Sequence, residues 1–284
     1  MTTASVRIMS RAELDLAVDW AAAEGWNPGH HDAIAFHASD PAGFLVGLVD
    51  GAPAAAISVV RYPGDFAFLG FYLVRPDRRG QGHGLAIWKA GMARVAGCVV
   101  GLDGVVAQQP NYKRSGFVLA YRNIRFGGAP PRDEVSAGRL PAGLVDARTL
   151  PFDALLALDS RLFPAPRPAF LSAWIALPGH RALAAIEDGR LAGFGVLRPC
   201  RNGAKIGPLY ADGPAIAARL VRGLCAGAGA GPVFLDVPEV NPGAVALAQS
   251  FGWTAQFETA RMYVGAAPEV DLKRLYGVTT FELG

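Results

Sequence analysis

The chain of 284 residues contains only three cysteines, and their spacing matches no metal-binding motif. Cys98, Cys200 and Cys225 form a sparse and odd-numbered set, which is typical of proteins kept in a reducing compartment. The first residues lack the apolar core of a signal peptide, and no uncharged apolar run reaches the length of a membrane span. We therefore expect a cytoplasmic protein with no metal site and no membrane partner.

An excess of one charge sign is also missing. Lysine and arginine total 27, aspartate and glutamate total 24, and the basic residues are scattered along the chain. This pattern argues against a nucleic acid partner. The hydrophobic fraction of 51% is enough for packed cores, and the length suits one large or two ordinary domains.

A glycine-rich loop between a predicted strand and a predicted helix is the most informative segment. The strand covers 66–74, the helix covers about 85–96, and Gly80, Gly82 and Gly84 alternate between them. Such glycines leave backbone N–H groups free to converge on an anion, aided by the positive end of the helix dipole. Because Arg75, Arg78 and Arg79 add positive charge, the loop predicts a diphosphate site.

Two common phosphate-binding loops do not fit this segment. A P-loop would end in Gly-Lys-Ser/Thr, but Leu85 and Ala86 follow Gly84. A Rossmann turn would read G-x-G-x-x-G with an acidic residue about 20 positions later, whereas the glycines here alternate and no βαβ repeat follows.

Two motifs in the right order do fit one family. Arg79, Gly82 and Gly84 match the pattern [Q/R]-x-x-G-x-[G/A] after a V-x-P strand end, and Tyr112 stands 28 residues after Gly84 in Tyr112-Lys113-Arg114-Ser115-Gly116-Phe117. The second segment resembles the Y-x-x-x-G-F element of the GNAT acetyltransferases. In that family the glycine loop grips the pyrophosphate of coenzyme A.

The predicted elements of the first half also follow the GNAT order, β-α-α-β-β-β-α-β-α-β. Their ranges are 5–9, 11–24, 32–38, 43–49, 53–61, 66–74, 85–96, 99–106, a short helix at Tyr112, and 117–126. The second half repeats this order and closes on Asn241-Pro242-Gly243 and Phe251-Gly252-Trp253. We predict an α/β (α+β) protein of two GNAT-like domains, each with a mixed, mostly antiparallel central sheet flanked by helices. An acetyltransferase domain would occupy 1–128, a linker 129–141, and a diverged domain 142–284.

The second half departs from the family pattern at its own phosphate position. Its central strand is followed by Ala211-Asp212-Gly213-Pro214, with one glycine and no arginine. Because an aspartate there would repel a diphosphate, we expect no coenzyme A site in this half. It would instead shape the acceptor pocket or stabilise the first domain.

The resemblance implies direct transfer of an acetyl group from acetyl-CoA to a primary amine in a ternary complex. Backbone groups of Leu73 and Val74 would bond the pantetheine arm, and one of their N–H groups would polarise the thioester. The remaining cofactor contacts implied by the family pattern are Arg75, Arg79, Gly80, Gln81, Gly82, His83, Gly84, Asn111 and Lys113.

Tyr112 is the candidate general acid for the departing CoA sulfur, and an aromatic packed on the sheet is the alternative. Asp103 on the next strand is the candidate base, although Gly104 behind it also suits a turn. His30, His31 and Asp32 are further candidates for this role. A water, or an amine that arrives neutral, would make a protein base unnecessary.

The loop 25–29 and the helix start after it would lie over the acceptor site in this fold, so Trp26, Asn27, His31 and Asp32 are the candidate acceptor contacts. A pocket between two domains favours a small-molecule amine over a protein. Two alternatives stay open: a CoA-binding regulatory or scaffold protein without turnover, and a transferase for another short acyl-CoA. The chain is expected to be a monomer or a homodimer.

Calorimetric titration of acetyl-CoA into the protein tests the cofactor site. We expect one site per chain, abolished by Gly82→Asp, because a carboxylate in the loop repels the diphosphate. Two sites would show that the second half also binds the cofactor, and the absence of binding would contradict the acetyltransferase interpretation.

Overall fold

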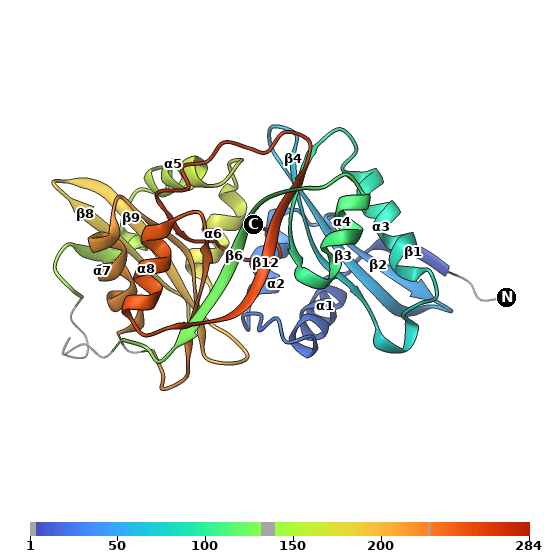
Figure 1. The fold of residues 1–284 in the computed structure, drawn as a ribbon, viewed down its shortest axis with the longest axis horizontal. Helices are drawn as coiled ribbons and strands as arrows, with labels where there is room; N and C mark the ends of the chain where they lie inside the picture. Colours follow the sequence, from blue (N-terminus) through green and yellow to red (C-terminus); the bar gives the residue numbers. More distant parts are fainter. Residues whose placement is uncertain (1–3, 132–139, 227) are drawn as a thin grey trace.

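The computed structural model describes residues 4–131, 140–226 and 228–284, so part of the predicted linker lies outside the described residues. The first half has the predicted order of elements (Figure 1). Its strands are β1 (Ala4–Ile8), β2 (Phe44–Val49), β3 (Ala52–Tyr62), β4 (Phe66–Val74), β5 (Val99–Val105) and β6 (Val118–Gly128). Its helices are α1 (Arg11–Ala23), α2 (Asp32–Ser39), α3 (His83–Arg94) and α4 (Gln109–Arg114), with short 3-10 turns at Pro76–Arg78 and Val106–Gln108.

The second half repeats this plan. Its strands are β7 (Leu144–Asp146), β8 (Arg181–Glu187), β9 (Arg190–Pro199), β10 (Ala204–Ala211), β11 (Val233–Pro238), β12 (Thr254–Val264) and β13 (Leu275–Gly277). Its helices are α5 (Phe152–Leu162), α6 (Pro168–Ala176), α7 (Pro214–Cys225) and α8 (Pro242–Ser250), with a 3-10 turn at Ala147–Thr149. None of the helices in the described part of the chain is long and apolar enough to cross a membrane.

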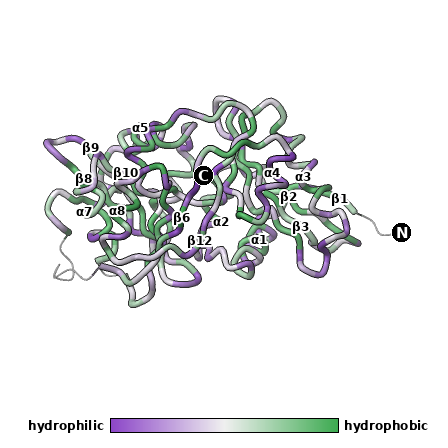
Figure 2. The backbone as a smooth tube through the Cα atoms, in the orientation of Figure 1, coloured by the Kyte–Doolittle hydropathy of each residue, from purple (hydrophilic) through white to green (hydrophobic). Residues whose placement is uncertain are grey.

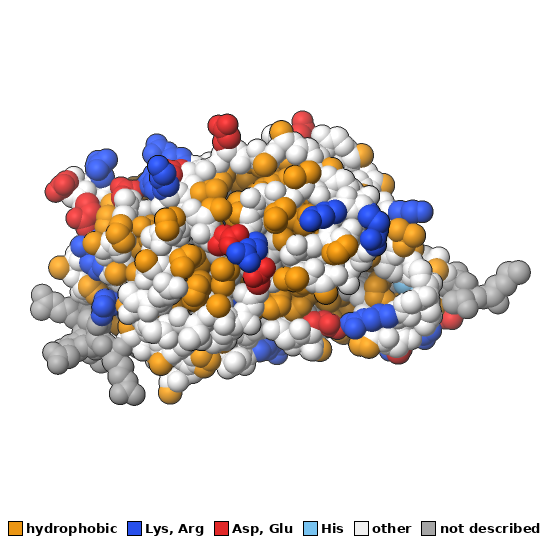
Figure 3. Space-filling view, in the orientation of Figure 1, with side chains coloured by type: hydrophobic (Ala, Val, Ile, Leu, Met, Phe, Trp, Pro, Cys, Tyr) orange, Lys and Arg blue, Asp and Glu red, His pale blue; other side chains and the backbone are white. Residues whose placement is uncertain are grey.

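The two halves exchange their last long strands. In space the strands follow the order β1-β2-β3-β4-β5-β12-β6-β11-β10-β9-β8-β7. Strand β12 of the second half therefore lies against β5 of the first half. Strand β6 of the first half in turn lies against β11 of the second half. β6 and β12 also pair with each other and join both halves into one sheet, which Figure 1 shows at the centre of the molecule. Arg122 of β6 pairs with Glu239 and Glu258. Figure 3 shows acidic and basic side chains side by side near the centre of this face of the molecule.

The exchange means that a cut between 128 and 142 does not separate two self-contained sheets. Each half-sheet borrows its final strand from the other half of the sequence, as in a domain swap within one chain. The domain limits 1–128 and 142–284 therefore remain a prediction about the sequence repeat, and the spatial division follows the sheet instead.

Local sequence signals account for the helix ends and faces. Ser10 and Glu13 form a capping box that starts α1. In α3 the side chain buried on the sheet is Ile87, with Gly91 beside Ile57 and Val59. Leu85, near the start of the same helix, is 58% exposed.

Among the described residues, one of three clusters of buried apolar side chains spans both halves. It contains residues of α1, α2, α5 and α6 and of strands from each half, and Figure 2 shows how hydrophobic residues are distributed along these elements. Phe36 of α2 stacks on Trp174 of α6 with ring centroids 6.2 Å apart. Since α2 and α6 come from different halves, this contact fixes the halves against each other as the shared sheet does.

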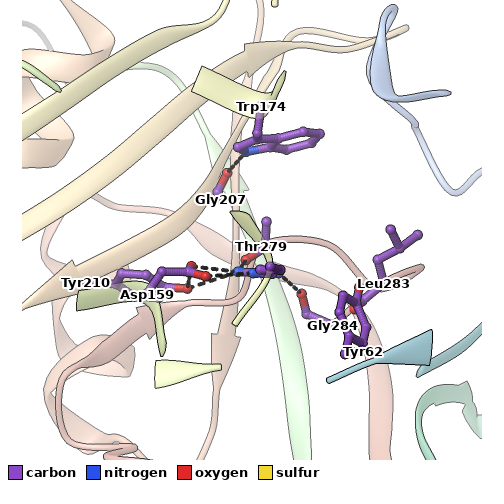
Figure 4. A network of polar contacts seen from close by, with 9 residues as sticks. Tyr62, Asp159, Trp174, Gly207, Tyr210, Thr279, Leu283 and Gly284 are labelled. Carbon is purple, nitrogen blue, oxygen red and sulfur yellow. Dashed lines mark hydrogen bonds and ion pairs between the residues drawn. The ribbon is translucent and has the colours of Figure 1, made fainter. Parts of the chain in front are cut away.

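The C-terminal segment passes between the halves. β13 pairs antiparallel with β10, and the chain then runs from Thr279 to Gly284 toward β4. Arg167 binds this segment, donating to Thr279 Oγ1 at 2.7 Å and to the Gly284 carbonyl at 3.3 Å (Figure 4). The same guanidinium makes two hydrogen bonds to Asp159, at 2.8 and 2.9 Å, and Tyr210 donates to Asp159 at 2.9 Å.

Replacing Arg167 by methionine is expected to lower the free energy of unfolding by about 3–5 kcal/mol, because it leaves the buried carboxylate of Asp159 without its cation. Urea unfolding followed by tryptophan fluorescence measures this loss. The double variant with Asp159→Leu should recover part of it. Arg148→Met is the control: its ion pair with Asp146 is half exposed, so the loss should be about 1 kcal/mol or less. Equal losses for both single variants would contradict the account.

Candidate active site

The site begins where β4 and β5 part. These strands pair in parallel from Phe66–Val99 to Leu69–Leu102 and then separate. On its other edge β4 carries a bulge, because Phe71 and Tyr72 together oppose Ile57 of β3. Phe71 has a φ of 45°, a strained conformation for an aromatic residue of the kind that concentrates at functional sites.

A cavity of about 70 Å³ lies at this separation. The first half supplies its floor from β4, β5 and α4, and the exchanged strands and the C-terminal segment supply its other walls. The lining residues are Trp26, Leu69, Gly70, Phe71, Tyr72, Leu102, Asp103, Val105, Gln108, Tyr112, Arg125, Phe257, Thr259, Phe281 and Glu282. The site is therefore built by both halves of the chain.

The glycine loop has the geometry of an anion site. Gly80 and Gly82 have φ of 74° and 85°, which glycine adopts without strain, and Gly82 is the N-cap of α3. The bond from Ala86 N to Gly82 O, 3.1 Å long, is the first of the helix. Helical geometry therefore leaves the N–H groups of His83, Gly84 and Leu85 without an intrahelical acceptor, at the positive end of the dipole.

Gly84 is needed for close packing at the same helix start. A Cβ there would lie 3.0 Å from the Tyr72 hydroxyl and 3.3 Å from a Val74 methyl group. Because no side chain separates α3 from β4, the free N–H groups stay next to the end of the central strand.

The side chains around the loop are held by the protein itself. Arg75 makes two bonds to Asp77, at 3.1 and 3.0 Å, and Arg79 donates to the Val74 carbonyl at 3.0 Å and also pairs with Glu24. Gln81 donates to the Asp77 carbonyl at 3.2 Å. The arginines thus brace the loop with their charges fixed beside it, and the backbone supplies the free donors.

A second hollow, of about 310 Å³, lies between Leu85, the residue after the loop, and the cavity. It is lined by Tyr72, Leu85, Trp88, Asn111, Tyr112, Arg114 and Ser115. Tyr72 and Tyr112 line both hollows, so the two meet at these rings. A long cofactor anchored at the start of α3 can follow the larger hollow and present its end to the smaller one.

The other predicted cofactor residues lie in different surroundings. Leu73 and Val74 lie on β4 opposite Ala56 and Ala55, beyond the bulge. Asn111 lines the larger hollow, whereas Lys113 is exposed on α4 and is not among the lining residues. His83 lines a separate hollow beside β1 and β2. Only the backbone of His83 therefore remains available at the glycine loop.

Tyr112 is buried at the meeting point of the two hollows. Its ring packs on Trp88 with centroids 5.7 Å apart, and a Cβ on Gly104 would lie only 2.6 Å from it. Burial raises the pKa of Tyr112 well above its usual value. The hydroxyl therefore keeps its proton across neutral pH, as a proton donor requires.

Asp103 lies in the middle of β5, not in a turn, and both of its oxygens have partners. Arg261 of β12 donates to them at 2.9 and 2.7 Å, and Asn123 of β6 donates at 2.8 Å. The side chain is fully buried, and burial raises the pKa of Asp103 against the opposing effect of Arg261. A base at this position would have to leave a bidentate ion pair, so the geometry favours a structural part for Asp103.

Of the four predicted acceptor contacts, only Trp26 lines the cavity. Asn27 exchanges hydrogen bonds with the backbone of Asn202, at 2.9 and 2.8 Å. Asp32 is fully buried, accepts from Gly29 N at 2.8 Å and pairs with Arg198 at 3.2 Å, while His31 precedes α2 as its N-cap residue. Asn27 and Asp32 thus join the first half to the second.

Five of the lining residues that were not predicted come from the exchanged strands and the C-terminal segment: Arg125 of β6, Phe257 and Thr259 of β12, and Phe281 and Glu282 of the C-terminal segment. Gly70 was the sequence signal for Phe281 and Glu282. A glycine inside a strand of otherwise bulky residues indicates that another backbone segment approaches the strand closely there. A Cβ on Gly70 would lie 2.2 Å from the carbonyl oxygen of Glu282.

The corresponding wedge of the second half is filled by the chain. β10 and β11 pair in parallel from Ala204–Val233 to Ile206–Leu235 and then part, as β4 and β5 do. β13 lies in that opening: it pairs with β10 at Leu209 and Tyr210, and Val278 N bonds the carbonyl of Asp236 on β11 at 2.9 Å. Pro214 at the first position of α7 also removes an N–H donor, so this half lacks both the open wedge and the glycine loop.

The chain belongs to the GNAT acetyltransferase family. Residues 11–117 match the Acetyltransferase (GNAT) family, and residues 155–277 match an Acetyltransferase (GNAT) domain. The predicted family, the mixed α/β fold and the presence of two GNAT domains are thereby confirmed.

Among characterised proteins, the chain is 31% identical over 276 residues to the holothin acyltransferase of Pseudoalteromonas sp. (strain SANK 73390), covering 97% of this chain and 92% of that one. The protein is an acyltransferase of this family. Its fold matches that of a Pyrococcus horikoshii protein provisionally assigned as an acetyltransferase, with a TM-score of 0.82, 22% identity and coverage of 99% and 96%. It also matches a tandem GNAT protein of the clavulanic acid biosynthesis pathway, with a TM-score of 0.62, 16% identity and coverage of 94% and 100%.

Tyr112→Phe is expected to lower kcat at least about tenfold while acyl-CoA affinity barely changes, because the change removes the proton donor and keeps the ring. Steady-state kinetics and a calorimetric titration measure the two quantities. Tyr276→Phe is the matched control, since that buried hydroxyl packs in the core of the second half, away from both hollows. An unaltered rate in Tyr112→Phe would remove the hydroxyl from the mechanism.

Proposed function

We propose that the protein transfers a short acyl group, acetyl before others, from coenzyme A to the primary amine of a small molecule by direct attack in a ternary complex. The observation that carries this proposal is the meeting of the two hollows at Tyr72 and Tyr112. One hollow leads from the free N–H groups of α3, and the other lies where β4 and β5 part.

The cofactor's diphosphate would bind at the start of α3, held by the N–H groups of His83, Gly84 and Leu85. Its pantetheine arm would run along the larger hollow and past the end of β4, with backbone groups of Leu73 and Val74 as partners. The bulge at Phe71 leaves backbone of β4 out of the regular ladder, which supplies a donor for the thioester oxygen. Tyr112 would protonate the departing sulfur.

The size and lining of the smaller cavity support a short acyl chain and a small acceptor. About 70 Å³ is room for a few water-sized groups, and Phe71 and Tyr72 bound the cavity on β4. Trp26, Phe257 and Phe281 add aromatic walls suited to a compact apolar acceptor. The related acyltransferase is named for holothin, so holothin belongs among the amines to be tested.

A matrix of acyl-CoA donors and amine acceptors, read by mass spectrometry of the product, tests the proposal. We expect kcat/KM to fall at least about tenfold from acetyl-CoA to hexanoyl-CoA, because the cavity rejects added methylenes. The Gly82→Asp protein should give no product with any pair. A preference for hexanoyl-CoA would overturn the short-chain assignment, and faster acylation of a lysine peptide than of every small amine would overturn the acceptor class.

A further inference from the structure

The C-terminal segment carries a glutamate into the cavity, and the segment is anchored on both sides of it. Arg198 donates to the Thr279 carbonyl at 3.1 Å, Leu283 N to Thr280 Oγ1 at 3.0 Å, and the Tyr62 hydroxyl to the Leu283 carbonyl at 3.1 Å. Figure 4 shows Tyr62, Leu283 and Gly284 at the end of this path. The backbone of Glu282 is therefore fixed against Gly70 of the central strand.

The carboxyl group of Glu282 has no hydrogen bond or ion pair within residues 4–131, 140–226 and 228–284, although the residue is only 4% exposed. This is an uncommon state for a buried acid, which is normally paired. The charged groups that act on it come from four elements: Asp32 of α2, Arg125 of β6, Arg198 of β9 and Lys205 of β10. Asp236 of β11 completes this set as the partner of Arg125.

Two ion pairs lie inside this set. Arg125 makes a bidentate pair with Asp236, at 2.6 and 2.8 Å, and Arg198 pairs with Asp32 at 3.2 Å. Lys205 is the remaining cation, and its Nζ donates to the Trp26 carbonyl at 3.0 Å. Glu282 is thus the one acid of this set whose oxygens are left for a group that enters the cavity.

We propose that Glu282 is the base that takes the proton from the acceptor amine; this rests on the proposed function. The ammonium form of the amine gives one proton to the carboxylate of Glu282. The neutral nitrogen then attacks the thioester carbon, a C–N bond forms, and the C–S bond breaks as the oxyanion collapses. Tyr112 gives its proton to the departing CoA sulfur, the nitrogen loses its second proton to the Tyr112 phenolate and keeps one hydrogen as the amide N–H, and the proton on Glu282 leaves to solvent.

The surroundings suit this task. Burial raises the pKa of Glu282, opposed by Lys205, Arg198 and Arg125, so the carboxylate is a stronger base than an exposed glutamate. Burial also lowers the pKa of Lys205 to about 8, which leaves that lysine mostly charged at neutral pH. Asp103, the other acid that lines the cavity, has both oxygens bound by Arg261 and Asn123.

The pH dependence of Glu282→Gln tests the assignment, with acetyl-CoA and the alkyl amine that the unaltered protein acylates fastest. Across about pH 5.5 to 9.5, kcat of the unaltered protein should rise through an acid limb as Glu282 loses its proton. Glu282→Gln should lower kcat at neutral pH at least about a hundredfold and abolish that limb. The difference in kcat between Glu282→Gln and the unaltered protein should shrink as pH approaches the pKa of the amine, because the amine then arrives neutral.

Two further variants separate chemistry from structure. Glu282→Asp keeps a carboxylate, so it should retain the acid limb and more activity than Glu282→Gln. Glu269→Gln removes the same charge from an exposed position that lines neither hollow, and its rate should match the unaltered protein. Acetyl-CoA titration and thermal unfolding of each variant verify that the cofactor site and the fold persist.

The outcomes distinguish the two proposals. A protein that acylates no amine in the matrix would overturn the proposed function. An active protein whose Glu282→Gln variant keeps the rate and the acid limb would overturn the role of Glu282 and leave the function standing. A rate loss of the same size at every pH, shared by Glu282→Asp, would show that the glutamate only shapes the cavity.

Discussion

The pairing of β12 between β5 and β6 is the constraint on which the site depends. Arg261 of β12 lies directly opposite Asp103 of β5, and both side chains are buried. A shift of one residue would place Arg261 on the other face of the sheet and leave Asp103 as an unpaired buried charge, which costs several kcal/mol. The ion pair therefore fixes the register, and the register places Phe257 and Thr259 in the cavity wall.

The same exchange gives the two GNAT halves different uses. One wedge stays open beside a glycine loop, while the other holds β13. A strand in the second wedge satisfies backbone groups that an empty wedge would leave for a cofactor. It also directs the chain toward the first wedge, because the six residues after Val278 reach from β10 to Gly70 and Phe68 of β4. The half whose wedge is filled thus completes the cavity of the other.

The parts of the site that depend on local backbone chemistry could be predicted from the sequence, and the parts that depend on distant pairing could not. The glycine loop and Tyr112 follow from short motifs, and the larger hollow is lined by both Tyr112 and Leu85, the residue after the loop. The prediction of Asp103 as a base did not include its ion pair with Arg261, because Arg261 stands 158 residues away on an exchanged strand. β6 and β12 occupy equivalent places in the two repeats, so either could close either sheet, and no local signal chooses between them.

The charges at the seam between the halves are hard to explain by stability alone. Buried ion pairs such as Arg125–Asp236 and Arg198–Asp32 roughly offset their own desolvation, and apolar residues of similar volume often do as well or better. Lys205 and Glu282 add a cation and an acid that have no ion pair with each other among the described residues, which is costlier still. If Lys205 and Glu282 had only a structural role, replacing both charges by apolar groups would serve that role better. A role at the cavity requires that at least the acid remain there, buried enough to be basic and open to the amine, and that is the arrangement the C-terminal segment maintains.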